Sequence, residues 1–267
     1  MTTEGVMQIS QQQEALAGLL VEARRNGMQL PSLPGDLVPE TVTAAYQVNQ
    51  IVAERLGWPL LGWKIAGTTE AVRTKLGLDT PIYGRSFQRF ACKSPARLKL
   101  SELLEPLVEC EFFVTLARDL PPRDEPWTMA DVVEAVAEVH AGIEVAECRY
   151  ANAALPPLPA ILADGSASGR YVFGDRIENW RDGLAPIRVR VEADGKPRRE
   201  GLGADVMGDP LRPLWWLAEE RRRWGDGLRA GETISTGSMT GMMPVRHGQH
   251  VCAWFGDVRK VEITFEG

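Results

Sequence analysis

Two glutamates on one expected strand are the clearest chemical feature of the sequence. Residues 106–116, PLVECEFFVTL, are rich in β-branched and aromatic side chains, which favours a β-strand. Side chains alternate along a strand, so Glu109 and Glu111 point to one face while Cys110 points to the other. Carboxylates about 7 Å apart on a strand with apolar neighbours repel each other unless a cation lies between them. The spacing fits a divalent-metal site, and it fits equally a solvated sheet face.

A third carboxylate lies on another expected strand, residues 141–148, where Glu144 has apolar neighbours. Three oxygen donors that leave room for water or substrate suit Mg²⁺ or Mn²⁺ better than zinc, which prefers histidine and cysteine. The three histidines form no HxH or HxxxH pair, so a histidine-bound metal is disfavoured.

Two more residues stand out from their expected surroundings. Lys64 lies inside an expected strand, residues 62–67, although a lysine that snorkels to the surface explains the pattern as well. Asp79 lies in an expected loop, residues 76–84, where an aspartate that merely forms a turn before a proline is the alternative.

Two segments of small residues could bind an anionic ligand through backbone N–H groups and hydroxyls, or could simply be turns. They are residues 162–169, LADGSASG, and residues 236–238, TGS. The candidate ligand-binding residues in these segments are Asp164, Ser166, Ser168, Thr236, Gly237 and Ser238.

Composition narrows the class of protein. The 267 residues carry a net charge of −6 and a pI of about 5.3, which argues against nucleic-acid binding. The basic run 221–223 follows two glutamates and is interpreted as a solvated helix face.

No apolar run is long enough for a membrane span and no secretion signal is evident. Four cysteines without a CxxC pair predict reduced thiols in a cytoplasm.

The expected helices and strands along the sequence indicate an α+β fold. Helical periodicity over residues 8–26 and 41–56 indicates an amino-terminal helical segment, residues 1–59, without visible chemistry. From residue 60 to 267, short apolar runs broken by glycine and proline predict a mainly β body. Within this body we expect helices at 128–140 and 210–223, a hairpin around Asp194-Gly195, and terminal strands at 232–241, 250–255 and 261–265.

Seven motifs occur in an order that resembles a known family. They are GWKIAGTT, GLDTPIYGR, VECEFF, GIEVAECR, LADGSASGRYVFG, DVMGDPLRPLWWLA and TGSMTGMMPV. Together they resemble the 2-keto-4-pentenoate hydratase and 4-oxalocrotonate decarboxylase group of the fumarylacetoacetate hydrolase superfamily. The resemblance covers roughly residue 60 to the end, and the helical start fits it.

This resemblance implies a mixed β-roll and cytoplasmic homo-oligomers. It implies Mg²⁺ or Mn²⁺ bound by Glu109, Glu111 and Glu144, with Lys64 and Asp79 handling protons. The implied partner is a small 2-oxo or 2-hydroxy enoic acid.

The implied reaction is addition of water to 2-hydroxypenta-2,4-dienoate, a step of aromatic-compound degradation. Three alternatives remain: a 4-oxalocrotonate-type decarboxylase, an acylpyruvate C–C hydrolase, and an inactive metal-binding relative. The hydrolases of the superfamily use a His–Glu pair on the amino-terminal side of the metal site, and no histidine precedes His140 here.

The sequence departs from the family pattern in one loop and at two further positions. The usual Asp-Asn-Ala-Ser loop reads Asp164-Gly-Ser-Ala167, and Asp209 replaces the histidine of a G-H-P motif. Arg170 stands where relatives have a small residue. It either binds the distal carboxylate of a decarboxylase substrate or faces outward.

Overall fold

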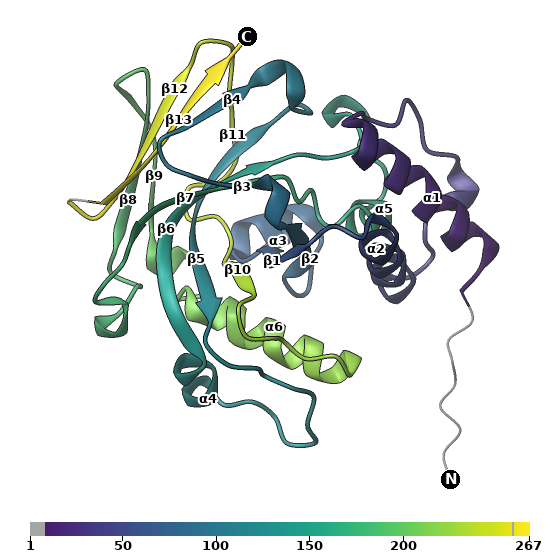
Figure 1. The fold of residues 1–267 in the computed structure, drawn as a ribbon, viewed down its shortest axis with the longest axis horizontal. Coiled ribbons are helices and arrows are strands. Elements are labelled where there is room, and N and C mark those ends of the chain that lie inside the picture. Colours follow the sequence, from purple (N-terminus) through teal and green to yellow (C-terminus); the bar gives the residue numbers. More distant parts are fainter. Residues whose placement is uncertain (1–8, 258) are drawn as a thin grey trace.

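The computed structural model describes residues 9–257 and 259–267 and contains two β-sheets flanked by helices (Figure 1). The helices are α1 (Gln11–Asn26), α2 (Val42–Leu56), α3 (Glu70–Leu76), α4 (Met129–Glu134), α5 (Leu158–Ala163) and α6 (Leu211–Trp224). The strands are β1 (Leu60–Ala66), β2 (Ile82–Phe87), β3 (Ala91–Lys93), β4 (Ala96–Lys99), β5 (Leu107–Leu116), β6 (Val136–Ala146), β7 (Arg170–Arg176), β8 (Arg188–Ala193), β9 (Lys196–Leu202), β10 (Thr233–Ser235), β11 (Met243–Pro244), β12 (His250–Phe255) and β13 (Arg259–Glu266). The mixed α+β fold with a curled sheet agrees with the expected β-roll.

The larger sheet is built around the two acidic strands. Its strand order is β2-β1-β10-β5-β6-β7-β3, with β11 paired to the start of β5. The predicted strand over 106–116 is confirmed as β5, and its antiparallel register with β6 places Glu109 opposite Glu144 and Glu111 opposite Gly142. Because residues paired across strands point to the same face, this register gathers the three glutamates on one side of the sheet.

The smaller sheet covers the opposite face of β5. Its order is β4-β13-β12-β8-β9, and the Phe112 and Phe255 rings meet at 5.5 Å between the two sheets. The predicted hairpin is confirmed: β8 and β9 pair antiparallel, and Asp194 at the turn has a left-handed φ of 54°. Glu109 and Glu111 therefore lie on the face of β5 that points away from the smaller sheet, and Phe112 packs in the core between the sheets.

The expected helix over 128–140 is confirmed only in its first part. Helix α4 starts from the capping box of Thr128 and Asp131 but ends at Glu134, and the chain is already extended at Val136. Valines are poor helix formers and good strand formers, and from Val136 onward the backbone can pair with β5. The expected strand over 232–241 is likewise shorter, because β10 ends at Ser235, and helix α3 was not predicted.

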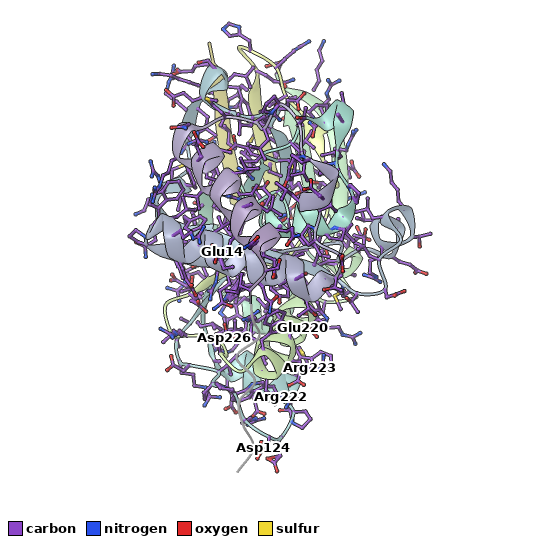
Figure 2. The ribbon with its side chains drawn as sticks, turned by 90° about the vertical axis from the view of Figure 1, so that its right-hand side faces the viewer. Glu14, Asp124, Glu220, Arg222, Arg223 and Asp226 are labelled. Carbon is purple, nitrogen blue, oxygen red and sulfur yellow. The ribbon has the colours of Figure 1, made fainter. Side chains whose placement is uncertain are left out.

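The basic run on α6 is only partly a solvated face. Figure 2 shows Arg222 and Arg223 beside Glu220 on this helix, where both arginines pair with glutamates one turn earlier. Arg221 is buried and contradicts the expectation, since it donates to Asp226 and to the Tyr83 hydroxyl. A buried arginine needs such partners to offset its lost hydration.

The amino-terminal helices pack directly on the β body. Helix α1 begins at the predicted region with Ser10 as its N-cap, and α2 has Thr41 as its N-cap; residue 8 lies outside the described residues. Both helices end at a glycine with a left-handed backbone, Gly27 and Gly57. Their buried side chains join the same hydrophobic core as the strands, and Figure 1 shows α1, α2 and α5 together at one side of the sheet. No helix within the described residues combines the length and the apolar character needed to cross a membrane.

Because the amino-terminal helices and the sheets share one hydrophobic core, we expect the segment 1–59 and the β body to unfold together. Leu20→Ala, at a fully buried position on α1, should lower the unfolding free energy by about 2–5 kcal/mol in one transition shared by helices and sheets. Denaturant unfolding followed by far-ultraviolet and near-ultraviolet circular dichroism measures this. Val42→Ala, at a residue 49% exposed on α2, is the control and should change little. Separate transitions for helices and sheets would instead show an independent amino-terminal unit.

Candidate metal and catalytic site

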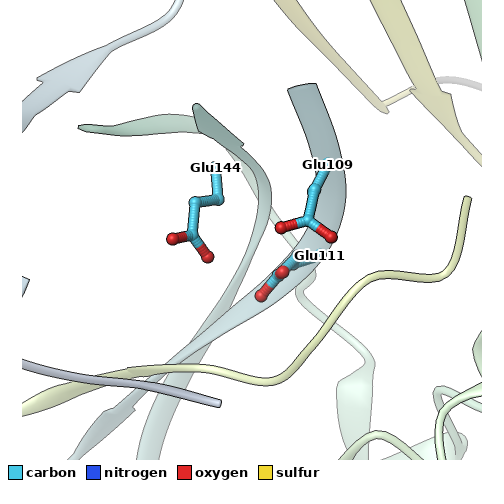
Figure 3. Close-up of side chains that lie close together, drawn as sticks. All are labelled: Glu109, Glu111 and Glu144. Carbon is cyan, nitrogen blue, oxygen red and sulfur yellow. The ribbon is translucent and has the colours of Figure 1, made fainter. Parts of the chain in front are cut away.

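Three carboxylates converge between β5 and β6 (Figure 3). One oxygen from each of Glu109, Glu111 and Glu144 can be chosen so that all three lie within 4.8 Å of one another. The residues are only 9%, 1% and 0% exposed, respectively. This burial rules out the solvated sheet face as the explanation of the Glu-x-Glu spacing.

The burial of the three carboxylates has a direct electrostatic effect. Lost hydration raises the pKa of all three glutamates, that of Glu144 to about 7. Repulsion from the other two carboxylates raises the pKa of Glu111 further, whereas Lys64 lowers the pKa of each member of the cluster. The carboxylates thus need more positive charge nearby than a single side chain supplies.

Lys64 supplies the only positive side chain in contact with the triad among the described residues. It is 1% exposed, its Nζ lies 3.4 Å from Glu144 Oε1, and Nζ donates to the carbonyl oxygen of Ser166 at 3.0 Å. Burial alone would lower the pKa of Lys64, but attraction to the three glutamates raises it. The snorkelling alternative is therefore wrong.

The segment after β10 contributes backbone and hydroxyl donors. Gly237 N–H donates to Glu111 Oε2 at 2.8 Å, and the Ser235 hydroxyl bonds to the same oxygen. Gly237 has a φ of 100°, and a Cβ there would overlap Thr68 Oγ1, so only glycine fits this position. The Ser238 hydroxyl lowers the pKa of Glu109, against the stronger effect of burial.

Three buried oxygens in this region make no hydrogen bond within the described part of the chain. They are Glu144 Oε2, Thr236 Oγ1 and Ser238 Oγ. Buried polar atoms in folded proteins nearly always have a partner, so these three indicate the position of a ligand. Three carboxylates and two unpaired hydroxyls are oxygen donors, which suits a hard divalent cation.

The small-residue loop also reaches the triad. The Ser168 hydroxyl lies 2.8 Å from the Tyr171 hydroxyl, which in turn donates to Glu144 Oε1 at 3.4 Å. Ser166 contributes its carbonyl to Lys64, while its hydroxyl donates to Tyr83 O at 2.7 Å. Tyr171 was missed by sequence reasoning, although it follows directly on the loop and pairs with Glu144 in the sheet.

Three candidate site residues, Asp164, Arg170 and Asp79, have surroundings that differ from those expected. The Asp164 carboxylate is fully buried and bound by Arg149 and Arg24. Arg170 pairs in register with Val145 and so points to the face opposite Glu144, where it donates to Glu102 O. Asp79 is exposed and makes no side-chain hydrogen bond or ion pair within residues 9–257 and 259–267.

Comparison with known proteins places this chain in a family, although no family model matches it. The chain is 31% identical to 2-keto-4-pentenoate hydratase of Burkholderia vietnamiensis over 94% of its own length and 96% of that protein. It is 33% identical to the TodF product hydratase of Pseudomonas putida over 87% of both chains.

Solved structures agree with these relatives. The 4-oxalocrotonate decarboxylase of Pseudomonas putida G7, solved with magnesium and adipate, superposes with a TM-score of 0.87 at 28% identity, covering 95% of this chain and 97% of that one. A Yersinia pestis protein assigned to the fumarylacetoacetate hydrolase family shares the fold, with a TM-score of 0.57 at 16% identity over 76% of this chain and 91% of that one. The chain therefore belongs to the 2-keto-4-pentenoate hydratase and 4-oxalocrotonate decarboxylase group and has the fold of the fumarylacetoacetate hydrolase family.

Proposed function

We propose that this protein is a metal-dependent hydro-lyase that converts 2-hydroxypenta-2,4-dienoate and water into 4-hydroxy-2-oxopentanoate. The observation that carries the proposal is the cluster of three buried glutamates facing one buried lysine. The similarity to hydratases over nearly the whole chain supports the substrate class.

The residues present fit Mg²⁺ or Mn²⁺. Glu109, Glu111 and Glu144 would hold the ion, and the unpaired Glu144 Oε2 is one oxygen available to it. When bound, the ion supplies Lewis acidity, which stabilises negative charge developing on the substrate oxygens. Thr236 and Ser238 are proposed to orient the substrate carboxylate through their unpaired hydroxyls. Gly237 is proposed to act indirectly, because its N–H donates to Glu111.

Lys64 is the proposed proton-transferring group. Its Nζ lies between Glu144 Oε1 and the carbonyl of Ser166, which together fix the direction of the ammonium group. Conversion of the dienol to its 2-oxo form requires a proton at C5, after which water adds its hydroxyl at C4 and a proton at C3. Asp79 is proposed as the second proton-handling residue on the family resemblance.

The remaining loop residues are proposed to shape the pocket. Ser168 orients Glu144 through Tyr171, and Ser166 and Asp164 act through the backbone of their turn. The homo-oligomer and the cytoplasmic location expected from the family stay predictions, and light scattering on the purified protein measures the first of them.

Decarboxylation is the second candidate. It is favoured by the 4-oxalocrotonate decarboxylase of Pseudomonas putida G7, which was solved with the dicarboxylate adipate and resembles nearly the whole chain. A distal substrate carboxylate would need a cation, and Arg170 faces the other side of the sheet and contacts Glu147 and Glu102. Hydration therefore remains the proposed reaction.

The metal site can be tested by removing single charges. Glu109→Gln and Glu111→Gln should each weaken Mg²⁺ binding by more than about tenfold, because loss of a direct ligand costs at least as much as loss of an outer-shell partner. Titration calorimetry measures the affinity, and circular dichroism confirms the fold. Glu138→Gln, farther along β6, is the control. Unchanged affinity in both triad variants would remove these residues from the metal site.

The role of Lys64 can be separated from metal binding. Lys64→Met should reduce kcat for 2-hydroxypenta-2,4-dienoate by about 10²–10⁴-fold, because a positioned proton donor is lost. Calorimetry should still detect Mg²⁺ binding. Lys75→Met, at an exposed lysine of α3, should behave as the wild type. Near-normal turnover by Lys64→Met with its metal site intact would exclude Lys64 from proton transfer.

Product analysis distinguishes the two lyase reactions. With added Mg²⁺, NMR should show 4-hydroxy-2-oxopentanoate formed from the mono-acid dienoate, and excess chelator should stop its formation. Arg170→Gly should change turnover of the mono-acid and of a dicarboxylic oxo-enoate by the same factor, because this guanidinium points away from the triad. A loss restricted to the diacid, or CO₂ release as the only reaction, would establish the decarboxylase instead.

A further inference from the structure

Three consecutive residues of the small-residue loop have a left-handed backbone. The φ angles of Gly165, Ser166 and Ala167 are 81°, 55° and 60°. Residues with side chains rarely adopt such angles, and two of these three are not glycine. A conformation of this kind persists only where the surrounding structure holds it, and such places concentrate at functional sites.

The residue just before this turn is clamped by two arginines. Arg149 Nε donates to both carboxylate oxygens of Asp164, at 2.9 and 3.0 Å, and the Arg149 backbone N–H adds a bond of 2.9 Å. Arg24 Nη2 lies 3.2 Å from Asp164 Oδ1 and also donates to the Asp164 carbonyl. All three side chains are buried. The clamp thus fixes both the side chain and the backbone of Asp164.

The other side of the turn meets strands β1 and β2. The Ser166 hydroxyl donates to Tyr83 O, and the carbonyl of Gly165 lies so close to Gly84 that a Cβ there would overlap it. Held from both sides, the turn presents the Ser166 carbonyl to Lys64 Nζ at 3.0 Å. Apart from Glu144, this carbonyl is the only hydrogen-bond or ion-pair partner of Nζ within the described residues.

We propose that Arg24 of the amino-terminal helix is a positioning residue for catalysis: with Arg149 it holds Asp164, and thereby keeps the left-handed turn that aims the Lys64 ammonium. The inference rests on the proposed role of Lys64. It gives the amino-terminal helical segment a part in turnover, although none of its residues contacts the three glutamates through a hydrogen bond or ion pair in the described chain.

Steady-state kinetics with 2-hydroxypenta-2,4-dienoate and Mg²⁺ test this role. Arg24→Met should lower kcat by about tenfold to a hundredfold, the cost of a misplaced catalytic group, with KM and Mg²⁺ affinity within about twofold of wild type. Arg24→Lys retains the charge and should recover part of kcat. Arg25→Met, at the exposed neighbour on the same helix, is the control. An unchanged kcat, or loss of Mg²⁺ binding in parallel with kcat, would overturn the proposal.

Two double variants test whether Arg24 acts through the turn and through Lys64. Ala167→Gly placed on Arg24→Met should restore part of kcat, because glycine adopts a φ near 60° without steric cost. Arg24→Met placed on Lys64→Met should cause no further loss, since the residue that it positions is already gone. Full additivity of the two losses, or no recovery with Ala167→Gly, would contradict the proposal.

Hydrogen exchange gives a readout that needs no substrate. The Ser166 and Ser168 amides bond to Ile161 O at 2.9 Å and Gly165 O at 3.0 Å, so a peptide spanning 161–170 should exchange faster in Arg24→Met. A peptide from β12 should exchange as in the wild type. If the 161–170 peptide of Arg24→Met exchanges at the wild-type rate, Arg24 does not hold the turn and the proposal is refuted. If the wild-type protein does not turn over the dienoate, only the proposed function is refuted.

Discussion

The structure depends on bringing three carboxylates and one ammonium group together away from water. Each charge loses hydration, and at Glu111 the repulsion from the other two glutamates exceeds the attraction to Lys64. Such a cluster lowers the stability of the chain that contains it. The antiparallel pairing of β5 with β6 makes it possible, because a slip of one residue would turn Glu144 into the core between the sheets.

Much of this arrangement could be predicted from local sequence patterns. The alternation in 106–116 correctly predicted that Glu109 and Glu111 share a face, and the turn signal at Asp194 correctly predicted the hairpin. Alternation of side chains along a strand is a local property that does not depend on residues far away in the sequence. It therefore predicts that the two glutamates share a face. It does not predict that they are buried, because burial depends on which elements cover that face.

The errors share a physical cause, since each depended on a partner far away in sequence. The valines of 128–140 fit a helix or a strand, and pairing with β5 decided in favour of the strand. Arg221 was expected to be solvated because it follows two glutamates. It is buried, and it donates to the Tyr83 hydroxyl, which is 138 residues away in the sequence. Asp164 was recognised as part of a ligand-binding loop, but its arginine partners carry no local signal.

The site therefore draws on two kinds of support. The metal ligands stand on paired strands, where hydrogen bonds between β5 and β6 fix the direction of the side chains, and donors from β7 and the segment after β10 hold two of the carboxylates. Lys64 has a flexible side chain and relies on the carbonyl of Ser166, in a turn that the backbone would not adopt unaided. Metal affinity and turnover consequently depend on different parts of the molecule. A segment such as α1, far from the reacting atoms, can govern one without the other.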